Sequence, residues 1–207
     1  MAPTVQIRIM DPKTLDISLR EVKRYLGYSR IALDDGDETL IEEAVEKVRP
    51  LLAPKACYCR YPLSLSAPDT VVLPYGSVHS SHLYKNLEGC SEVWIFAATI
   101  GAAFDRQLAR ESLRSMTVAA MMQAVGASAV EAVCDGLNEE LVQVAAEEGK
   151  ECVRRYSPGY GNYALENQKG VFALLNPAKH IGLSLTDSLL MKPEKSVTAL
   201  IGIKEKI

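Results

Sequence analysis

The sequence predicts an α+β fold with a mainly antiparallel sheet flanked by helices. Strand-like and helical segments follow one another without the regular strand–helix–strand alternation of a parallel sheet. Residues 93–97 (VWIFA) form a continuous apolar run of strand length, which is typical of a central strand. Residues 116–147 carry one apolar stripe at steps of three and four residues, which predicts a single long helix with a buried first half. A doubly wound sheet is the alternative architecture.

The N-terminal half contains two helices and several short strands. Residues 5–9 alternate apolar and polar side chains, as a half-buried strand does. The capping box Ser18-Leu-Arg-Glu21 predicts the start of a helix, which Gly27 is suited to end. Further strands are predicted at 57–63 and 70–73, and further helices at 40–48 and 80–87. We expect a single domain over residues 1–207, in which residues 1–53 form a possible helical lobe.

The C-terminal half is built around the long helix. Its stripe consists of Val118, Met122, Val125, Ala129, Val133, Leu137, Leu141 and Val144. Other helices are predicted at about 102–113 and 164–175, and an irregular segment at 156–163. Strands are predicted at 183–191 and 197–203, joined by the turn-like sequence KPEK.

Composition excludes several classes of function. The chain has 207 residues, 48% of them hydrophobic, a formal net charge of −3 and a pI of about 5.7. This balance argues against nucleic-acid binding and against an anionic membrane surface. The N-terminus lacks a basic start followed by an apolar stretch, so we expect a soluble cytoplasmic protein. Residues 116–134 are rich in alanine and include Gln123 and Glu131, which suits a buried helix better than a bilayer span.

Motifs for metals, nucleotides and nucleophiles are missing from the sequence. Its five cysteines are scattered, and the Cys57-x-Cys59 pair has no further ligands at suitable spacing. His79 and His82 lie three residues apart but have no acidic or thiol partners in the pattern. No phosphate-binding loop, dinucleotide fingerprint or G-x-S-x-G elbow is present. We therefore assign no metal ligand and no catalytic side chain.

Glu131 is the one ionisable residue between Arg114 and Asp135. It lies about 200° around the helix from Val133, so it faces away from the apolar stripe and onto small residues. A desolvated carboxylate costs several kcal/mol unless it is paired, so Glu131 needs a cation, from an arginine or a ligand. A structural ion pair or simple exposure is the alternative interpretation.

Residues 155–161 (RYSPGYG) form the second candidate site. Pro158 fixes one backbone angle, and Gly159 and Gly161 permit conformations closed to other residues. We expect an extended segment whose backbone groups are open to a ligand. Arg155 can hold a carboxylate through two hydrogen bonds, and Tyr160 offers a flat face to adenine or to a sulfonium. A rigid loop with packed tyrosines is the alternative.

These motifs resemble the activation domain of cobalamin-dependent methionine synthase. The resemblance is carried by the R-x-x-P-G-Y core of residues 155–160, by Gln168-Lys169, and by the pattern L-T-[DE]-S…M-x-P…S-V within residues 182–197. It is sharp over about 124–202 and looser over 93–101 and 21–27. The family has a twisted antiparallel sheet with helices and binds S-adenosylmethionine in a shallow groove.

The resemblance implies a role for each candidate residue. The family's ligand-binding glutamate falls on Glu131, which would face the ammonium group of S-adenosylmethionine. Its arginine falls on Arg155, which would face the ligand carboxylate. Its tyrosine falls on Tyr160, and the Pro158-Gly159 backbone would line the adenine side. In the long enzymes of the family the chain continues and supplies another aromatic side chain near the ligand, and an N-terminal aspartate also contacts it; neither has a placed counterpart here.

The implied function is reactivation of a corrinoid enzyme. We expect a separate subunit that presents S-adenosylmethionine to a partner holding cobalamin, namely a methionine synthase without its own activation domain. A flavodoxin-type protein is the expected electron donor. The chain would not be catalytically complete alone. Two alternatives stay open: a docking module for corrinoid protein that binds no S-adenosylmethionine, and an independent small-molecule binder or enzyme on the same fold.

Overall fold

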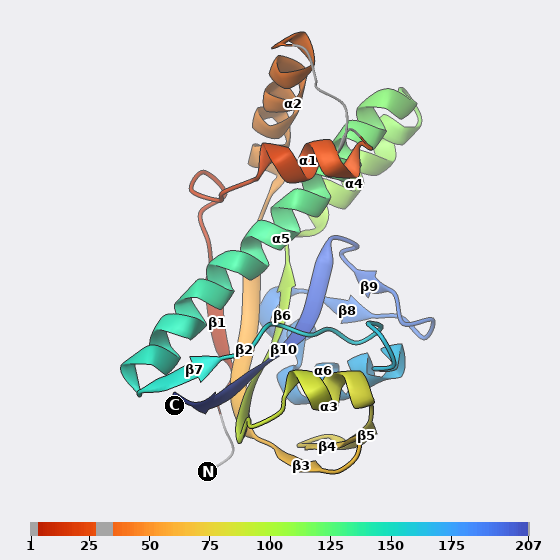
Figure 1. The fold of residues 1–207 in the computed structure, drawn as a ribbon. Coiled ribbons are helices and arrows are strands. Elements are labelled where there is room, and N and C mark those ends of the chain that lie inside the picture. The colour runs from red at the N-terminus through yellow and green to blue at the C-terminus, as the bar shows by residue number, and fades with distance from the viewer. Residues whose placement is uncertain (1–3, 28–34, 207) are drawn as a thin grey trace.

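The computed structural model describes residues 4–27 and 35–206. A five-stranded antiparallel sheet lies at its centre, with the strand order β1-β2-β6-β10-β7 (Figure 1). Its strands are β1 (Gln6–Ile9), β2 (Lys55–Pro62), β6 (Glu92–Thr99), β7 (Lys150–Cys152) and β10 (Ser196–Glu205). A small sheet contains β3 (Ser64–Ser66), β4 (Thr70–Leu73) and β5 (Gly76–His79), and β8 (Ser184–Leu185) pairs with β9 (Met191–Lys192). The predicted α+β class is confirmed.

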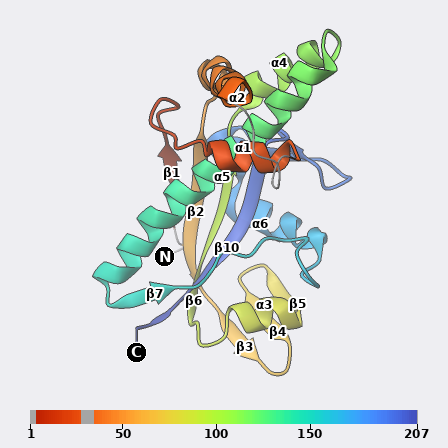
Figure 2. The ribbon, with the colours of Figure 1, turned by 45° about the horizontal axis from the view of Figure 1, so that its top comes forward.

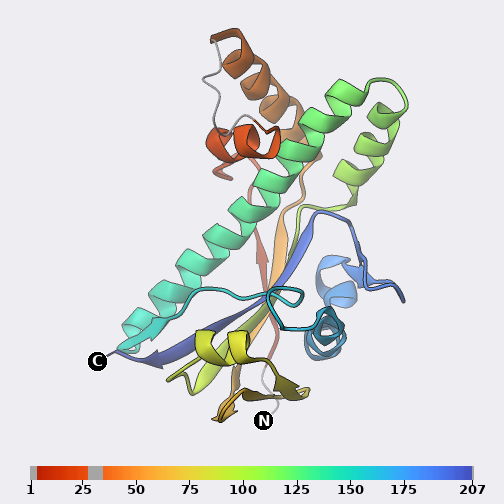
Figure 3. The ribbon, with the colours of Figure 1, turned by 45° about the vertical axis from the view of Figure 1, so that its right-hand side comes forward.

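Helices cover both faces of the large sheet. On one face, α5 (Met116–Glu147) runs diagonally across the strands, and α1 (Leu19–Tyr25), α2 (Asp35–Val48) and α4 (Ala102–Ser112) pack against it (Figure 2). On the other face lie α3 (Ser81–Asn86), α6 (Gln168–Leu175) and α7 (Pro177–Ile181) (Figure 3). Two short 3₁₀ turns, η1 (Arg49–Leu51) and η2 (Leu165–Asn167), complete the elements.

Serine residues start three of the helices. The hydroxyl groups of Ser18, Ser80 and Ser115 accept hydrogen bonds from the backbone N–H three residues onward, at the starts of α1, α3 and α5. A serine in this position satisfies one of the N–H groups that a helix leaves free at its first turn. The helix starts predicted at Ser18 and at residue 116 are therefore confirmed.

Two hydrophobic cores lie on opposite faces of the sheet. The α5 face holds the buried stripe residues from Met122 to Leu141, together with Ile17, Val22 and Ile41 from the N-terminal region. The N-terminal helices thus share one core with α5. The other face holds the β2 cysteines and side chains from α3, α6 and α7. The two end residues of the predicted stripe, Val118 and Val144, are exposed.

Some predicted elements differ from the structure. The strand predicted at 183–191 is wrong: only its two ends pair, as β8 and β9, and residues 186–190 form a turn. The turn is stabilised by the Thr186 hydroxyl, which accepts from the N–H of Leu190. The strand predicted at 197–203 is confirmed within β10, which pairs with β6 and β7. Strands β3, β5 and β7 and helix α7 were not predicted.

Candidate functional site

A groove of about 840 Å³ lies where α5, the segment after β7, the start of α6 and β10 meet. The chain that leaves β7 runs beside the edge of β10 and then turns away toward α6 (Figure 1, Figure 3). The lining residues are Glu131, Asp135, Asn138, Val142, Cys152, Val153, Arg154, Arg155, Tyr156, Ser157, Pro158, Tyr160, Gln168, Met191, Ser196, Val197 and Thr198. A volume of this size lies within the range of small-molecule sites.

The groove opens where pairing along one edge of β10 stops. Val153 donates to Gly202, and Tyr156 exchanges two hydrogen bonds with Leu200, each of 2.9 Å. Between these bonds the segment after β7 has two residues, whereas β10 has only Ile201, so this segment forms a β-bulge. After Tyr156 the chain turns away from the sheet, and residues 196–199 keep β6 as a partner on one side only.

Arg154 and Arg155 are the two residues of this bulge, and Arg155 points toward α5. Its guanidinium donates to Glu131 Oε2 at 2.7 Å and also to Asp135 Oδ1. Glu131 and Asp135 lie one helical turn apart on α5, so one arginine reaches both. Burial lowers the pKa of Arg155, but the hydrogen bond and charge of Asp135, with Glu131, outweigh it and raise the pKa above its usual value. Arg155 stays charged.

Glu131 is less buried than a desolvated carboxylate would be. Its side chain is 38% exposed, on the flank of α5 that faces the groove. The small residue Ser128, one turn earlier, packs toward the N-terminal region and donates to the carbonyl of Ser18. The carboxylate therefore meets both the guanidinium and solvent, and a ligand entering the groove can reach it.

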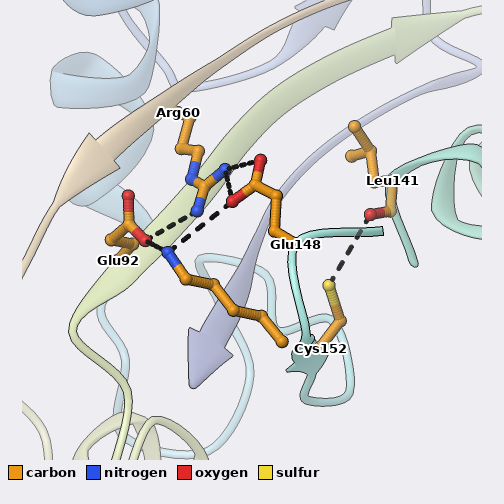
Figure 4. A network of polar contacts seen from close by, with 6 residues as sticks. Arg60, Glu92, Leu141, Glu148 and Cys152 are labelled. Carbon is orange, nitrogen blue, oxygen red and sulfur yellow. Dashed lines mark hydrogen bonds and ion pairs between the residues drawn. The ribbon is translucent and has the colours of Figure 1, made fainter. Parts of the chain in front are cut away.

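A network of ion pairs holds the chain just before the bulge (Figure 4). Arg60 on β2 donates to both oxygens of Glu148, at the end of α5, and to Glu92 on β6 at 2.6 Å. Lys150 on β7 donates to the same oxygen of Glu92, also at 2.6 Å. The hydrogen bond from Arg60, and then the one from Lys150, lower the pKa of Glu92 against the opposing effect of burial. The network fixes the α5–β7 connection to the sheet and so sets the path that leads to Arg155.

Residues 157–163 fold into consecutive tight turns. Tyr160 N–H donates to Ser157 C=O, with Pro158 and Gly159 at the corners, and Gly159 has φ +94°. Proline followed by a positive-φ glycine is the signature of a type II turn. Tyr163 and Gly159 then form further hydrogen bonds within the segment. The prediction of an extended segment with open backbone groups is wrong, because the chain turns here and the N–H groups of Gly159, Tyr160 and Tyr163 bond within the segment.

The predicted site residues divide into two sets. Glu131, Arg155, Pro158 and Tyr160 all line the groove. Tyr160 is 66% exposed and its ring meets Tyr156 edge-on, with centroids 6.3 Å apart.

Gly159 and Gly161 do not line the groove, and act instead on the backbone of the turns. Gly161 has φ +54°, and a side chain there would meet the ring of His82 and the hydroxyl of Tyr156. These glycines shape the turns that carry Tyr160 to the groove, but they are not part of the groove lining.

Sequence reasoning missed several groove residues, and two of them are buried polar side chains. Gln168 and Thr198 are 5% and 2% exposed, and both line the groove. Gln168 Oε1 and Thr198 Oγ1 are buried, and neither has a hydrogen-bond partner within the described residues. Gln168 stood in the family pattern without a role, and Thr198 carried no signal because its neighbours read as a plain strand. Asp135, the second partner of Arg155, was also missed.

The histidines and cysteines form no site of their own. Within residues 4–27 and 35–206, no three His, Cys, Asp or Glu side chains lie together as metal ligands would. All five cysteines are free, and four are buried. Burial raises the pKa of Cys57 to about 12. Its thiol is therefore held in the protonated, unreactive form.

Comparison with known proteins identifies the family. Residues 92–206 match the family described as vitamin B12 dependent methionine synthase, activation domain. The chain belongs to this family. The match contains every residue that lines the groove. No curated protein matches the sequence.

A solved activation domain has the same fold. The crystal structure of the MetH reactivation domain bound to AdoHcy matches with a TM-score of 0.71 and 16% identity, over 96% of this chain and 78% of that chain. The resemblance read from residues 155–197 is thus confirmed at the level of family and fold.

Helix α5 is long and apolar enough to cross a membrane, but 56% of its most apolar window is buried in this fold, as in a core helix.

Proposed function

We propose that this activation-domain protein binds S-adenosylmethionine in the groove and presents its methyl group to a cobalamin-dependent methionine synthase. One observation carries the proposal. Glu131 and Arg155, 24 residues apart in the sequence, meet at 2.7 Å on the wall of a ligand-sized groove. The related reactivation domain was solved with S-adenosylhomocysteine, the demethylated form of this ligand, which supports the assignment.

The charged lining suits a zwitterionic amino-acid group. Two acids and two arginines line the groove: Glu131, Asp135, Arg154 and Arg155. A ligand carboxylate replaces Glu131 on one arm of Arg155, while Asp135 continues to hold the other arm. Glu131, freed from the arginine, accepts the ligand's ammonium group. After the exchange Arg155 still has two carboxylate partners and Glu131 has a cationic one, so neither charge is left unpaired in the groove.

The remainder of the ligand meets apolar and aromatic surface. Tyr160 has an exposed ring, braced edge-on by Tyr156, on which an adenine or a sulfonium can lie. Pro158, Met191 and Val197 complete the apolar lining. Because the Pro158-Gly159 turn fixes the backbone beside Tyr160, little conformational freedom is lost on binding.

The protein contributes placement rather than proton transfer. A corrinoid held by the partner would supply the methyl acceptor: one electron from a flavodoxin-type donor would convert cob(II)alamin to cobalt(I), which would take the methyl group and leave S-adenosylhomocysteine. The residues of this chain hold the sulfonium so that its methyl group faces the partner, at about 3–3.5 Å in a near-attack geometry. No proton leaves the methyl group, so no general base is required. We propose a cytoplasmic partner that holds cobalamin and lacks its own activation domain.

Calorimetry with S-adenosylmethionine and S-adenosylhomocysteine tests the proposal. Wild type binds both, and Glu131→Gln weakens binding of both by about 10- to 150-fold, the worth of a hydrogen bond to a charged group. Glu139→Gln is the matched control, because this exposed acid lies on the same helix outside the groove lining. Absence of binding by wild type, with and without the corrinoid protein, sinks the proposal.

A docking module without S-adenosylmethionine binding is the second candidate. It is favoured by the mutual pairing of Glu131 and Arg155, since charges that satisfy each other need no ligand. The two functions differ in linkage: a ligand-presenting domain and its corrinoid partner enhance each other's binding, because coupling between sites is reciprocal. A corrinoid-protein affinity that is the same with and without S-adenosylmethionine identifies the docking module.

A further inference from the structure

Gln168 and Thr198 lie on the opposite side of the groove from Glu131. Residues of β10 alternate between faces of the sheet: Val197 and Ala199 pack toward α5, and Leu200 packs toward α6. Thr198 shares the face of Leu200, and Gln168 is the first residue of α6, on that same face. The groove therefore wraps around the free edge of β10, from an ionic end on α5 to a polar end on the α6 side.

The polar end of the groove lacks hydrogen-bond partners in the part of the chain that the structure describes. There, Gln168 Oε1 and Thr198 Oγ1 are buried without partners, although nearly all buried polar atoms of folded proteins have one. The backbone of Thr198 adds two further polar groups to this end of the groove. Leu200 directs both its N–H and its C=O to Tyr156, so by alternation the N–H and C=O of Thr198 face the same edge of β10. The chain that pairs with Leu200 has already turned away at this point.

We propose that Gln168 and Thr198 form the subsite that selects an adenine base, with Gln168 as the specificity-determining residue. This inference rests on the proposed function and assigns the base end of that ligand. The carboxamide presents an acceptor beside a donor, the pattern that pairs with the exocyclic amino group and an adjacent ring nitrogen of adenine. The Thr198 hydroxyl can donate to a second ring nitrogen. Tyr160 stacks on the base, whereas Gln168 reads its edge.

The test compares adenine with a purine that lacks the 6-amino group. Binding of S-adenosylhomocysteine and of its purine-riboside analogue is measured by calorimetry for wild type and for Gln168→Met, which keeps the side chain's length without its polar atoms. Wild type prefers the adenine ligand by about 5- to 150-fold, since the analogue leaves the buried acceptor unpaired. In Gln168→Met the preference falls to about 2-fold or less.

Lys169→Met is the matched control, because this neighbouring residue is exposed and outside the groove lining. It keeps the wild-type preference. The melting temperature of the ligand-free protein gives a second readout: Gln168→Met leaves it unchanged or raises it, because the substitution removes an unsatisfied buried polar atom. Thr198→Val replaces Gln168→Met as the test of the subsite if Gln168→Met does not fold. It should weaken binding of both ligands alike, because both carry the ring nitrogen that accepts from the Thr198 hydroxyl.

The outcomes separate this inference from the proposed function. A Gln168→Met protein that binds with an undiminished preference for adenine overturns the base subsite and leaves S-adenosylmethionine binding standing. A wild type that binds no S-adenosylhomocysteine, but binds adenosine over purine riboside in a Gln168-dependent way, overturns the proposed ligand and upholds the subsite. If wild type binds neither nucleoside, both are wrong.

Discussion

Replacing Glu92 with glutamine tests whether the network of Figure 4 anchors the chain that carries Arg155. Glu92 accepts two charged hydrogen bonds, from Arg60 and from Lys150, on one oxygen. Its side chain is 30% exposed and that of Arg60 is 19% exposed, so the pair is partly screened by water. We therefore expect loss of the Arg60 pair to cost about 1 kcal/mol, at the upper end of the range for exposed pairs.

The sign of the pH dependence follows from the lowered pKa of Glu92. The usual carboxyl pKa is 4.5, and the native value lies below it, so the unfolded chain takes up this proton first as the pH falls. The stabilisation is complete above the unfolded pKa and is lost as the pH falls through the native one. Wild type should exceed Glu92→Gln in melting temperature by about 2–4 °C at about pH 7, and the difference should shrink as the pH falls through the native pKa of Glu92.

Thermal unfolding of both proteins across this pH range is the assay. Glu147→Gln is the control, because this exposed acid accepts one hydrogen bond from the Gln143 amide and should change little at either pH. The quantity to compare is the melting-temperature difference between wild type and Glu92→Gln at each pH. A difference that persists unchanged at low pH refutes the reasoning, since glutamine would then be acting through packing rather than through charge.

Three further predictions concern packing, the ionic end of the groove and the thiols. Gly126→Ala should destabilise the protein by about 1–3 kcal/mol in urea unfolding, because its Cβ would overlap the Phe104 ring on α4; Phe104→Leu should recover part of this loss. Asp135→Asn should weaken S-adenosylmethionine binding by about 2- to 5-fold in calorimetry, because Arg155 loses its second anchor. Cys57 should resist a thiol reagent until the protein unfolds, because burial raises its pKa to about 12.

Each of these predictions has a result that contradicts it. Additive effects in the Gly126 and Phe104 double mutant would show that the two residues do not interact. An Asp135→Asn protein with wild-type affinity would mean that Arg155 binds the ligand without its second anchor. Labelling of Cys57 at the rate of a free thiol, in protein that retains its native circular dichroism, would show that β2 opens locally.

Local signals explain which parts of the fold were predictable from the sequence. Helix α5 was predicted with its observed bounds, because its apolar stripe repeats over many turns. The start of α1 was also predictable, because Ser18 is a local capping signal and its hydroxyl accepts from the N–H of Glu21. The strand at 183–191 failed because its apolar residues flank a turn closed by Thr186, and a period-two pattern cannot show which side chain will close a turn.

The candidate site was predictable in part, for a related reason. Glu131 and Arg155 were found because each is a charge in an unusual setting, and this is visible along the chain. Their contact depends on the bulge opposite Ile201, a property of strand pairing that no single segment carries. Gln168 and Thr198 were not predicted as ligand-facing residues, because an unpartnered buried atom is recognisable only when every neighbour is in place.

The position of the groove follows from how the sheet ends. A strand edge presents N–H and C=O groups that need partners, and β10 is covered along only part of its length. The bulge formed by Arg154 and Arg155 lies where pairing along this edge of β10 stops, and it turns Arg155 toward α5. The bulge therefore accompanies the open edge and supplies the arginine of its ionic end. Beyond the bulge, the turns that take the chain away from β10 carry Tyr160 and lead into α6, which brings Gln168 against the opposite face. One departure of the chain from the sheet thus assembles the acid, the guanidinium, the aromatic face and the polar end, and this is why residues spread from 131 to 198 converge on one ligand-sized space.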